Sequence, residues 1–294
     1  MWDRDRDCVK VHGVSNATQP AALFPGQGSQ TPDMRALVAQ RAPELLDAVT
    51  ELVGEDPFAR VEEDTRFAQP AIFCASLVGW DALGLTPRAA AGHSLGELAA
   101  LVAAGALDRD DALRLVVLRG RLMGEARNGS MLALVGADLD TAREIAQAGG
   151  VTVANDNAPG QVVLSGALDA LDATEQEASD RKVRVIRLNV AGAFHSPLME
   201  HAAAPFRAAL DETAIHAPKF PVFSCAAAAP FTDIREELAN AICRPVRWRE
   251  TVIALHDAGA PSFVEIGPGK VLTKMGKRIL KGVTFQSAED LVNA

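Results

Sequence analysis

The sequence of 294 residues has few cysteines and no long hydrophobic run. Its four cysteines include no C-x-x-C pair, and its first ten residues are charged where a secretory signal peptide is apolar. We therefore expect a cytoplasmic protein without a disulfide framework. The longest apolar segment, residues 98–107, is much shorter than the ~20 residues that cross a bilayer, so no membrane span is expected.

The chain also lacks a basic excess, an internal repeat and a metal-binding pattern. The net charge of -9, with no run of basic residues, argues against a nucleic-acid surface, because such a surface must neutralise phosphates. No repeat or low-complexity tract occurs beyond the alanines at 226–229. No histidine or cysteine pair has zinc-like spacing, so we expect no metal. The expected partners are small molecules or proteins.

The composition is that of a compact globular protein. Hydrophobic residues make up 48% and charged residues 23%, which suffices for one large core with or without a smaller satellite domain. Residues 1–20 follow neither a helical nor a strand period, and we expect them to form a loosely attached extension. We expect the protein to be a monomer.

Short apolar segments that alternate with helical stretches predict a parallel α/β sheet. The candidate strands are residues 21–24, 89–92, 220–224 and 262–266. The first two run directly into glycine-containing turns. Because binding sites in such sheets lie at the carboxyl ends of the strands, these turns are the expected place for chemistry.

The pattern changes between about residues 130 and 188. There, strand and helix signals follow in the order βαββαβ, which predicts a small ferredoxin-like subdomain. The expected elements are a strand at 131–135, a helix at 140–148, strands at 151–154 and 162–165, a helix at 167–179 and a strand at 183–187. The expected domains are thus a large α/β hydrolase-like domain of residues 21–129 and 189–294, and an inserted subdomain of residues 130–188.

The segment at 92–96, Gly-His-Ser-Leu-Gly, matches the G-x-S-x-G nucleophile motif. It lies between a short strand and an apolar helix, which is the context that the motif requires. Glycines allow the sharp turn that exposes the serine hydroxyl above the N-terminus of the next helix. We take Ser94 as the candidate nucleophile. The alternative is an unreactive turn between a strand and a helix.

A serine nucleophile needs a base, and His195 is the best placed of the six histidines. The following Ser196 and Pro197 are typical of a helix start, which places His195 at a junction between a loop and a helix. His93 is adjacent to Ser94, but neighbouring side chains on a sharp turn diverge. We therefore expect a packing role for His93.

Arg119 lies within the apolar stripe of a predicted helix over residues 110–126. A cation on the inward face must be paired. Its partner is either a structural carboxylate or an anionic ligand, and the sequence pattern favours the first. Arg114 and Arg121 lie off the stripe, where solvent is expected to reach them.

Together these residues closely resemble the malonyl-CoA:acyl carrier protein transacylases of fatty-acid and polyketide synthesis. The resemblance covers residues 21–280 and includes an α/β hydrolase-like core with a ferredoxin-like insert. It rests on seven blocks in the order of that family: FPGQGSQ at 24–30, QPA at 69–71, GHSLGE at 92–97, LRGRLM at 118–123, NDNAPGQ at 155–161, FHSPLM at 194–199 and EIGPGK at 265–270.

The resemblance implies roles for the candidate residues. Ser94 would be acylated, His195 would be the general base, and Arg119 would bind the free carboxylate of the substrate bidentately. The backbone N–H groups of Gln27 and Leu95 would form the oxyanion hole. The expected chemistry therefore moves a malonyl group from coenzyme A, through a malonyl-serine, to the phosphopantetheine thiol of an acyl carrier protein, without a resident cofactor.

The resemblance also implies supporting residues. A backbone carbonyl near Ala241 would orient the catalytic histidine. Asn155 and Asn157 are expected in a loop near the cleft, where they support the site or form a turn. Phe194 resembles the residue of malonyl-using relatives, as does Leu95, which predicts a preference for malonyl over methylmalonyl groups.

The sequence departs from the family at Gly192, where related polyketide enzymes often have a polar residue, and at residues 224–226, which lack the usual asparagine. Basic residues gather in two places, where they either steer an acidic carrier protein or are simply solvated. They are Lys182 and Arg184 in the insert, and Lys270, Lys274, Lys277, Arg278 and Lys281 near the C-terminus.

Two other functions share parts of the pattern. A serine esterase or thioesterase would share G-x-S-x-G, but lipases and esterases normally have an HGGG-type loop, which is absent here, and an acidic triad member. A non-catalytic relative that only docks carrier proteins would usually lose the serine, histidine or arginine, and all three persist. The motifs are common to fatty-acid, polyketide and malonate-decarboxylase pathways.

Overall fold

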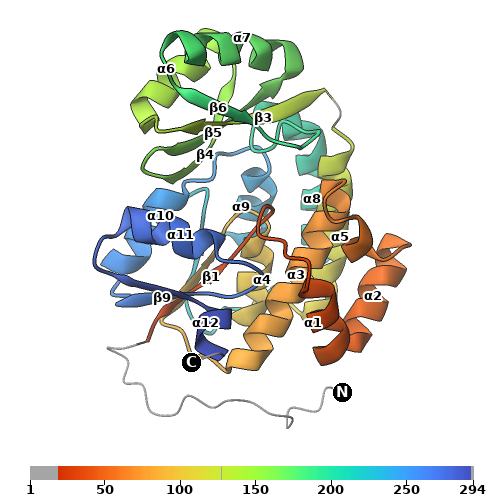
Figure 1. Cartoon of the computed structure of the whole chain (residues 1–294). Helices are drawn as coiled ribbons and strands as arrows, with labels where there is room; N and C mark the ends of the chain where they lie inside the picture. Colours follow the sequence, from red (N-terminus) through yellow and green to blue (C-terminus); the bar gives the residue numbers. More distant parts are fainter. Residues whose placement is uncertain (1–18, 127, 293–294) are drawn as a thin grey trace.

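The structure, a computed structural model, describes residues 19–126 and 128–292, which form two sheets and the helices around them (Figure 1). The extension expected at residues 1–20 lies almost wholly outside the described residues. Within the described ranges, no helix is long and apolar enough to cross a membrane.

The larger sheet has the strand order β10-β9-β1-β2-β7-β8. All neighbouring strands are parallel except β7 and β8, which confirms the predicted α/β class. Phe24 pairs with Gly92, so the turns after β1 and β2 begin side by side. The strands are β1 (Ala21–Phe24), β2 (Ala89–Gly92), β7 (Val222–Ser224), β8 (Ala229–Pro230), β9 (Ser262–Glu265) and β10 (Thr284–Ser287). The short edge strands β8 and β10 were missed by the sequence analysis.

Helices cover the larger sheet on both faces, and α3 and α5 stand side by side (Figure 1). Asp64 caps the N-terminus of α3 by accepting a hydrogen bond from the amide of Arg66, and Gly84 ends this helix in the left-handed conformation. The helices are α1 (Met34–Arg41), α2 (Pro43–Val53), α3 (Thr65–Leu83), α4 (Gly96–Ala103), α5 (Arg109–Gly124), α8 (Glu200–Glu212), α9 (Ile234–Ala241), α10 (Trp248–Asp257), α11 (Val271–Ile279) and α12 (Ala288–Val292).

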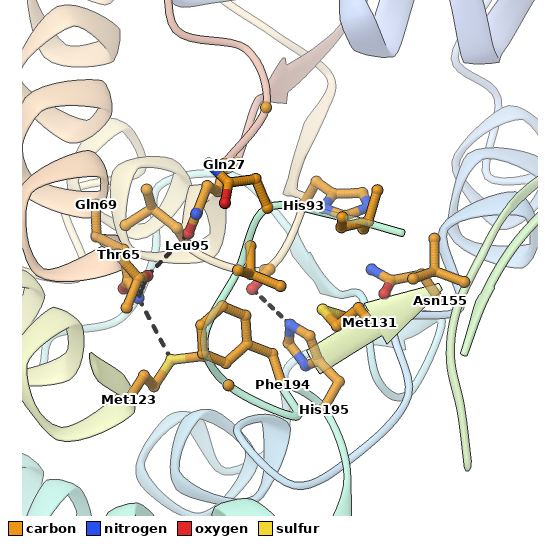
Figure 2. Close-up of a pocket in the computed structure, with 18 of the residues that line it drawn as sticks. Gln27, Thr65, Gln69, His93, Leu95, Met123, Met131, Asn155, Phe194 and His195 are labelled. Carbon is orange, nitrogen blue, oxygen red and sulfur yellow. Dashed lines mark hydrogen bonds between the residues drawn. The ribbon is translucent and has the colours of Figure 1, made fainter. Parts of the chain in front are cut away.

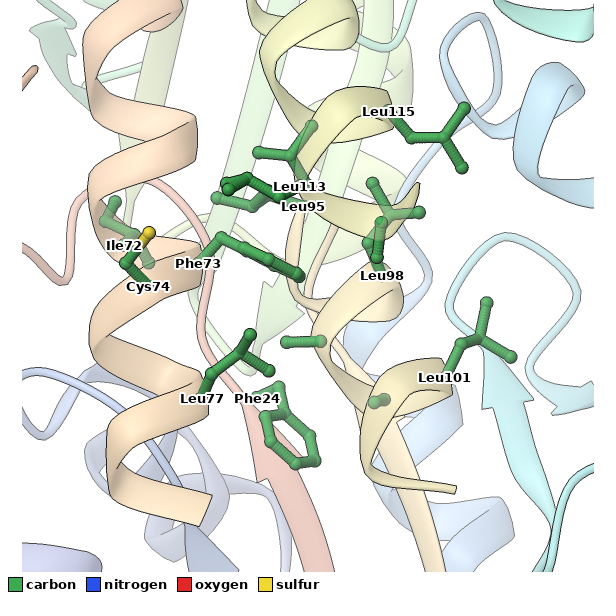
Figure 3. Close-up of a cluster of buried hydrophobic side chains, with 14 of the residues drawn as sticks. Phe24, Ile72, Phe73, Cys74, Leu77, Leu95, Leu98, Leu101, Leu113 and Leu115 are labelled. Atoms are coloured by element: carbon green, nitrogen blue, oxygen red, sulfur yellow. The ribbon is translucent and has the colours of Figure 1, made fainter. Parts of the chain in front are cut away.

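The main hydrophobic core joins β1 to α3, α4 and α5 (Figure 3). Phe24, Phe73, Leu77 and Leu98 are at most 1% exposed. Full burial of one such side chain contributes about 1.5–3 kcal/mol. The core therefore holds α3 and α5 firmly against the strand ends that carry the candidate site.

The second sheet has the order β4-β5-β3-β6 and is antiparallel throughout. Two helices pack on one face, around a separate core that contains Leu132, Leu164 and Leu171. This topology confirms the predicted ferredoxin-like insert. Its elements are β3 (Gly129–Val135), α6 (Leu139–Gly149), β4 (Thr152–Ala158), β5 (Gln161–Ala167), α7 (Leu168–Asp180) and β6 (Arg184–Arg187).

Strand β4 connects the small sheet to the larger domain. Asp156 N–H donates to Val246 O at 2.9 Å, Val246 N–H donates to Ala154 O at 2.8 Å, and the Asp156 carboxylate pairs with Arg249. The expectation that Asn155 and Asn157 lie in a loop was wrong, because both belong to β4. Asparagine is rare in strands, but β4 continues through two register shifts and gains the contact to Val246.

Candidate active site

Ser94 occupies the tight turn between β2 and α4. Its φ of 53° is unusual for a residue other than glycine and holds the hydroxyl at the end of the sheet. A Cβ at Gly96 would lie 2.1 Å from the carbonyl oxygen of Phe24, so only glycine allows α4 to start this close to β1. The positive end of the α4 dipole therefore lies next to Ser94.

His195 lies against Ser94, although 101 residues separate them in the sequence. Its Nε2 is 2.8 Å from Ser94 Oγ, and its Nδ1 is 3.0 Å from Ala241 O and 3.1 Å from Arg244 O. Carbonyl oxygens only accept hydrogen bonds, so Nδ1 carries the proton. Nε2 is thereby left to accept the proton of Ser94. The expected carbonyl at Ala241 is in place, and the second one, at Arg244, was not anticipated.

Burial lowers the pKa of His195 to about 3, and the nearby charge of Arg119 contributes to this shift. The imidazole is therefore neutral at neutral pH and can act as a base. Ala241 is the last residue of α9, where helix carbonyls have no partner within the helix. The negative end of this helix would stabilise the imidazolium that forms after proton transfer.

The lowered pKa predicts activity in mild acid. As pH falls through 6.5, an ordinary histidine gains a proton, but His195 keeps Nε2 free because its pKa lies far lower. We therefore expect kcat/KM for acylation to stay high until the pH is well below 6.5, which a profile from about pH 4 to 8 would show. Half-loss of kcat/KM near pH 6.5 would contradict this prediction.

Arg119 reaches Ser94 from α5. The residue is 4% exposed, its Nη1 donates to Gln69 Oε1 at 2.6 Å, and its Nη2 donates to Ser94 Oγ at 3.0 Å. Among the described residues its guanidinium forms no salt bridge, and the carboxylate with the largest effect on it is the buried Glu97, which opposes the lowering of the pKa of Arg119 by burial. Burial lowers the pKa of Arg119 to about 10, and the guanidinium is still charged at neutral pH.

Glu97 is a buried carboxylate that the sequence analysis did not single out. It is 2% exposed, and its Oε1 accepts the N–H of Cys225 at 2.7 Å. Burial raises the pKa of Glu97 to about 7, while the charge of Arg119 opposes this shift. A single acidic residue in an otherwise apolar, buried helix is a signal that could have pointed to it.

The amides proposed for the oxyanion hole belong to two neighbouring turns of the larger sheet. Gln27 belongs to the turn after β1, and Leu95 directly follows Ser94 at the start of α4. In the described loops and turns, neither amide donates a backbone hydrogen bond. Both residues line the cavity that contains Ser94, so their N–H groups can serve a ligand there.

Gln69, which contacts Arg119, was present in a sequence block without an assigned role, and Thr65, one turn before it on α3, belonged to no block. Gln69 Nε2 donates to Thr65 Oγ1 at 2.9 Å, and Thr65 Oγ1 donates to Gln27 Oε1 at 2.8 Å. Figure 2 shows Gln27, Thr65 and Gln69 grouped on one side of the cavity, opposite His195. Polar side chains on the inner face of the otherwise apolar α3 are the signal that could have found them.

His93 lies on the opposite side of the Ser94 turn from Gln69, the residue that contacts Arg119. Its Nε2 is 2.8 Å from Asn157 Oδ1, and its ring lies 5.3 Å from that of Trp248. Burial lowers the pKa of His93. These contacts support the expected packing role, and they connect Asn157 on β4 to the nucleophile turn. Asn155 and Asn157 both line the cavity.

A cavity of about 490 Å³ opens above Ser94, between the larger sheet and the small subdomain. This volume is typical of a small-molecule site. Phe194 forms part of its wall (Figure 2). A Cβ at Gly192 would lie 2.4 Å from Cε1 of Phe194, so the glycine that departs from the family pattern leaves room for this ring. No group of three metal-ligating side chains occurs within residues 19–126 and 128–292.

The chain is similar in sequence to several known proteins. It is 36% identical to the malonyl CoA-acyl carrier protein transacylase of Bacillus subtilis, covering 92% of this chain and 94% of that protein. It is 38% identical to the polyketide biosynthesis protein ThaF of Burkholderia thailandensis over 88% of this chain, but spans only 24% of ThaF.

Solved structures show the same fold. The malonyl-CoA:acyl carrier protein transacylase of Xanthomonas oryzae superimposes with a TM-score of 0.86 and 35% identity, covering 93% of this chain and 96% of the other. A malonyl-transacylase solved with its type II polyketide acyl carrier protein gives a TM-score of 0.84 and 34% identity, covering 92% and 96%. Residues 23–293 match the profile of the acyl transferase domain, and the chain belongs to this family.

Proposed function

We propose that this protein transfers a malonyl group from coenzyme A to the thiol of an acyl carrier protein. The observation that carries the proposal is the position of Arg119, whose guanidinium lies 3.0 Å from the Ser94 hydroxyl inside the cavity. A nucleophile with a buried cation beside it suits an acyl group that ends in a carboxylate. The relatives named as malonyl transacylases support the same substrate.

The first half of the reaction makes a malonyl-serine. His195 Nε2 takes the proton of Ser94, and Oγ attacks the thioester carbonyl. The N–H groups of Gln27 and Leu95 stabilise the negative oxygen of the tetrahedral intermediate. The carbon–sulfur bond then breaks, and coenzyme A leaves as a thiol with the proton from the imidazolium.

The second half returns Ser94 to its free state. The thiol of the carrier protein gives its proton to His195 and attacks the serine ester. The tetrahedral intermediate collapses, the carbon–oxygen bond to Ser94 breaks, and His195 returns the proton to Oγ. Substrate thioester and chain residues supply every group, so the proposal includes no resident cofactor.

The contacts of His195 argue against the esterase alternative. In an esterase triad, Nδ1 of the histidine meets a carboxylate, whereas His195 Nδ1 meets two backbone carbonyls. The non-catalytic alternative is disfavoured because the hydroxyl, imidazole and guanidinium are in direct contact. A transferase agrees best with this site.

The Arg119→Ala variant tests the proposed substrate. Without the guanidinium the malonyl carboxylate is left unpaired, and we expect kcat/KM for malonyl-CoA to fall by about 10- to 100-fold, equivalent to about 1.5–3 kcal/mol. Transfer from acetyl-CoA should persist or improve. The matched control is Arg121→Ala on the same helix, since Arg121 is 65% exposed. An unchanged malonyl-to-acetyl ratio in Arg119→Ala would contradict the proposal.

Phe194 is expected to favour malonyl over methylmalonyl groups. Its ring lines the cavity beside His195, where an added methyl on the α-carbon would need space. One methyl changes the preference by only about 10- to 200-fold. Competition between malonyl-CoA and methylmalonyl-CoA at equal concentrations should show this preference in the wild type and a smaller one in Phe194→Ser. Equal use of both substrates by the wild type would refute the assignment.

Helix α11 is the proposed contact for the acidic carrier protein. Its residues Val271, Leu272 and Met275 line the cavity, while Lys274 is exposed on the same helix. Arg278 reaches across to Gln161 on β5. Positive charge at the rim of the cavity would speed encounter with an acidic partner.

The proposal extends to the location, the oligomeric state and the partners of the protein. The described cysteines, Cys74, Cys225 and Cys243, are free thiols, in agreement with a cytoplasmic location. We propose a monomer that binds malonyl-CoA and its carrier protein, with no nucleic-acid or membrane partner.

A further inference from the structure

A continuous hydrogen-bond chain connects Arg119 to the turn after β1. Arg119 Nη1 is 2.6 Å from Gln69 Oε1, Gln69 Nε2 is 2.9 Å from Thr65 Oγ1, and Thr65 Oγ1 is 2.8 Å from Gln27 Oε1. Its middle members, Gln69 and Thr65, lie one helical turn apart on α3 (Figure 2). The chain thus links the proposed carboxylate-binding group to a residue of the proposed oxyanion hole.

Hydrogen-bond chemistry fixes the direction of the first two links, and the structure gives the direction of the third. A guanidinium can only donate, so the oxygen of Gln69 must face Arg119 and its nitrogen must face Thr65. The hydroxyl of Thr65 accepts from that nitrogen and has one proton left to donate, which goes to Gln27 Oε1. All three bonds therefore point away from the positive charge, an arrangement in which each bond strengthens the next.

The members of this hydrogen-bond chain differ in burial. Gln69 is 2% and Thr65 is 5% exposed, so breaking their contacts would leave buried polar atoms with fewer partners. Gln69 Nε2 has a second, weaker contact with Met123 Sδ at 3.4 Å. Gln27 is exposed, and the Thr65 hydroxyl is the contact that holds its side chain against the core among the described residues.

We propose that Thr65 is a positioning residue for the reaction: by holding the Gln27 side chain, it fixes the backbone N–H of Gln27 toward the acyl oxygen. The proposal rests on the proposed function, because the Gln27 amide matters only if Ser94 attacks a carbonyl. One chain of hydrogen bonds, buried at Gln69 and Thr65, would then anchor both the group that binds the carboxylate and the group that stabilises the oxyanion.

The test removes the hydroxyl and retains the shape of the side chain. In Thr65→Val, rapid-quench measurement of the malonyl-serine should show an acylation rate about 10-fold lower, since the oxyanion donor is less well placed. The concentration of malonyl-CoA at half-maximal rate should change by less than about 2-fold, because Arg119 keeps its contact with Gln69. Thr65→Ser, which restores the hydroxyl, should recover the rate.

Gln27→Ala tests the same link from its exposed end, where folding is not at stake. It removes the acceptor of the Thr65 hydroxyl and leaves the backbone amide in place, so it should reproduce the lower acylation rate. In the Gln27→Ala background, Thr65→Val should have little further effect, because both changes break one contact.

The outcomes separate this inference from the proposed function. A wild type that forms no malonyl-serine would overturn the proposed function and the inference with it. A wild type that acylates normally, together with a Gln27→Ala variant that acylates at the same rate, would overturn the inference alone. Independent, multiplying effects of Thr65→Val and Gln27→Ala would also overturn it, since Thr65 would then act by another route.

Discussion

Replacing Ser94 by alanine is expected to abolish the covalent malonyl-enzyme and with it malonyl transfer. The hydroxyl is the only group at this turn that lies within 2.8 Å of His195 Nε2 in the described structure, and alanine offers no atom that could attack a thioester. Intact-protein mass spectrometry after mixing with malonyl-CoA should show one malonyl group on the wild type and none on Ser94→Ala.

Two controls make this result specific. Ser29→Ala removes another buried hydroxyl of the motif region, which donates to Gly26 O and has no contact with His195, and this variant should keep the adduct. Loss of the adduct on addition of a carrier protein would show that the ester is an intermediate. A malonyl adduct of equal yield on Ser94→Ala would refute the assignment of the nucleophile.

Replacing His195 by alanine is expected to slow acylation by about 10²–10⁴-fold, which is the usual contribution of a general base. The effect follows from geometry, since Nε2 is 2.8 Å from Ser94 Oγ and two carbonyls hold the opposite side of the ring. Rapid-quench kinetics with malonyl-CoA would measure the acylation step directly.

His93 provides the matched comparison for His195. It is also a buried imidazole beside Ser94, but its Nε2 meets Asn157 rather than the nucleophile. We expect His93→Ala to change acylation much less than His195→Ala does at equal folded fraction, as judged by circular dichroism. A His195→Ala rate within a few-fold of the wild type would show that another group removes the proton.

Local patterns in the sequence predicted the central strands of the larger sheet and the elements of the insert, but not the short edge strands β8 and β10. Short apolar strands that end in glycine turns predicted the parallel sheet, and the βαββαβ order predicted the insert, because each signal depends on neighbours in the chain. The errors also concerned individual segments of the chain. Asn155 and Asn157 were expected in a loop, whereas β4 accommodates them through register shifts and a contact with Val246.

Residue type and context pointed to Ser94 and His195 as the reacting pair. The carboxylate-binding role of Arg119, the amides of Gln27 and Leu95 and the carbonyl of Ala241 came from the resemblance to the family. Glu97, Thr65 and Gln69 were not assigned a role, since an isolated polar residue in a helix does not reveal what lies opposite it. Nothing in the sequence marks the carbonyl of Arg244 as a partner of His195, because every residue has a backbone carbonyl.

The sequence by itself determined the sharp turn at Ser94 and the inward position of Arg119, because glycine spacing and helical period act within a few residues. Only the tertiary structure decided which groups meet. Packing of α3, α4 and α5 on β1 brings Arg119 within 3.0 Å of Ser94, and the end of α9 sets the proton of His195 on Nδ1. Such contacts join residues far apart in the chain, so they depend on how whole elements pack.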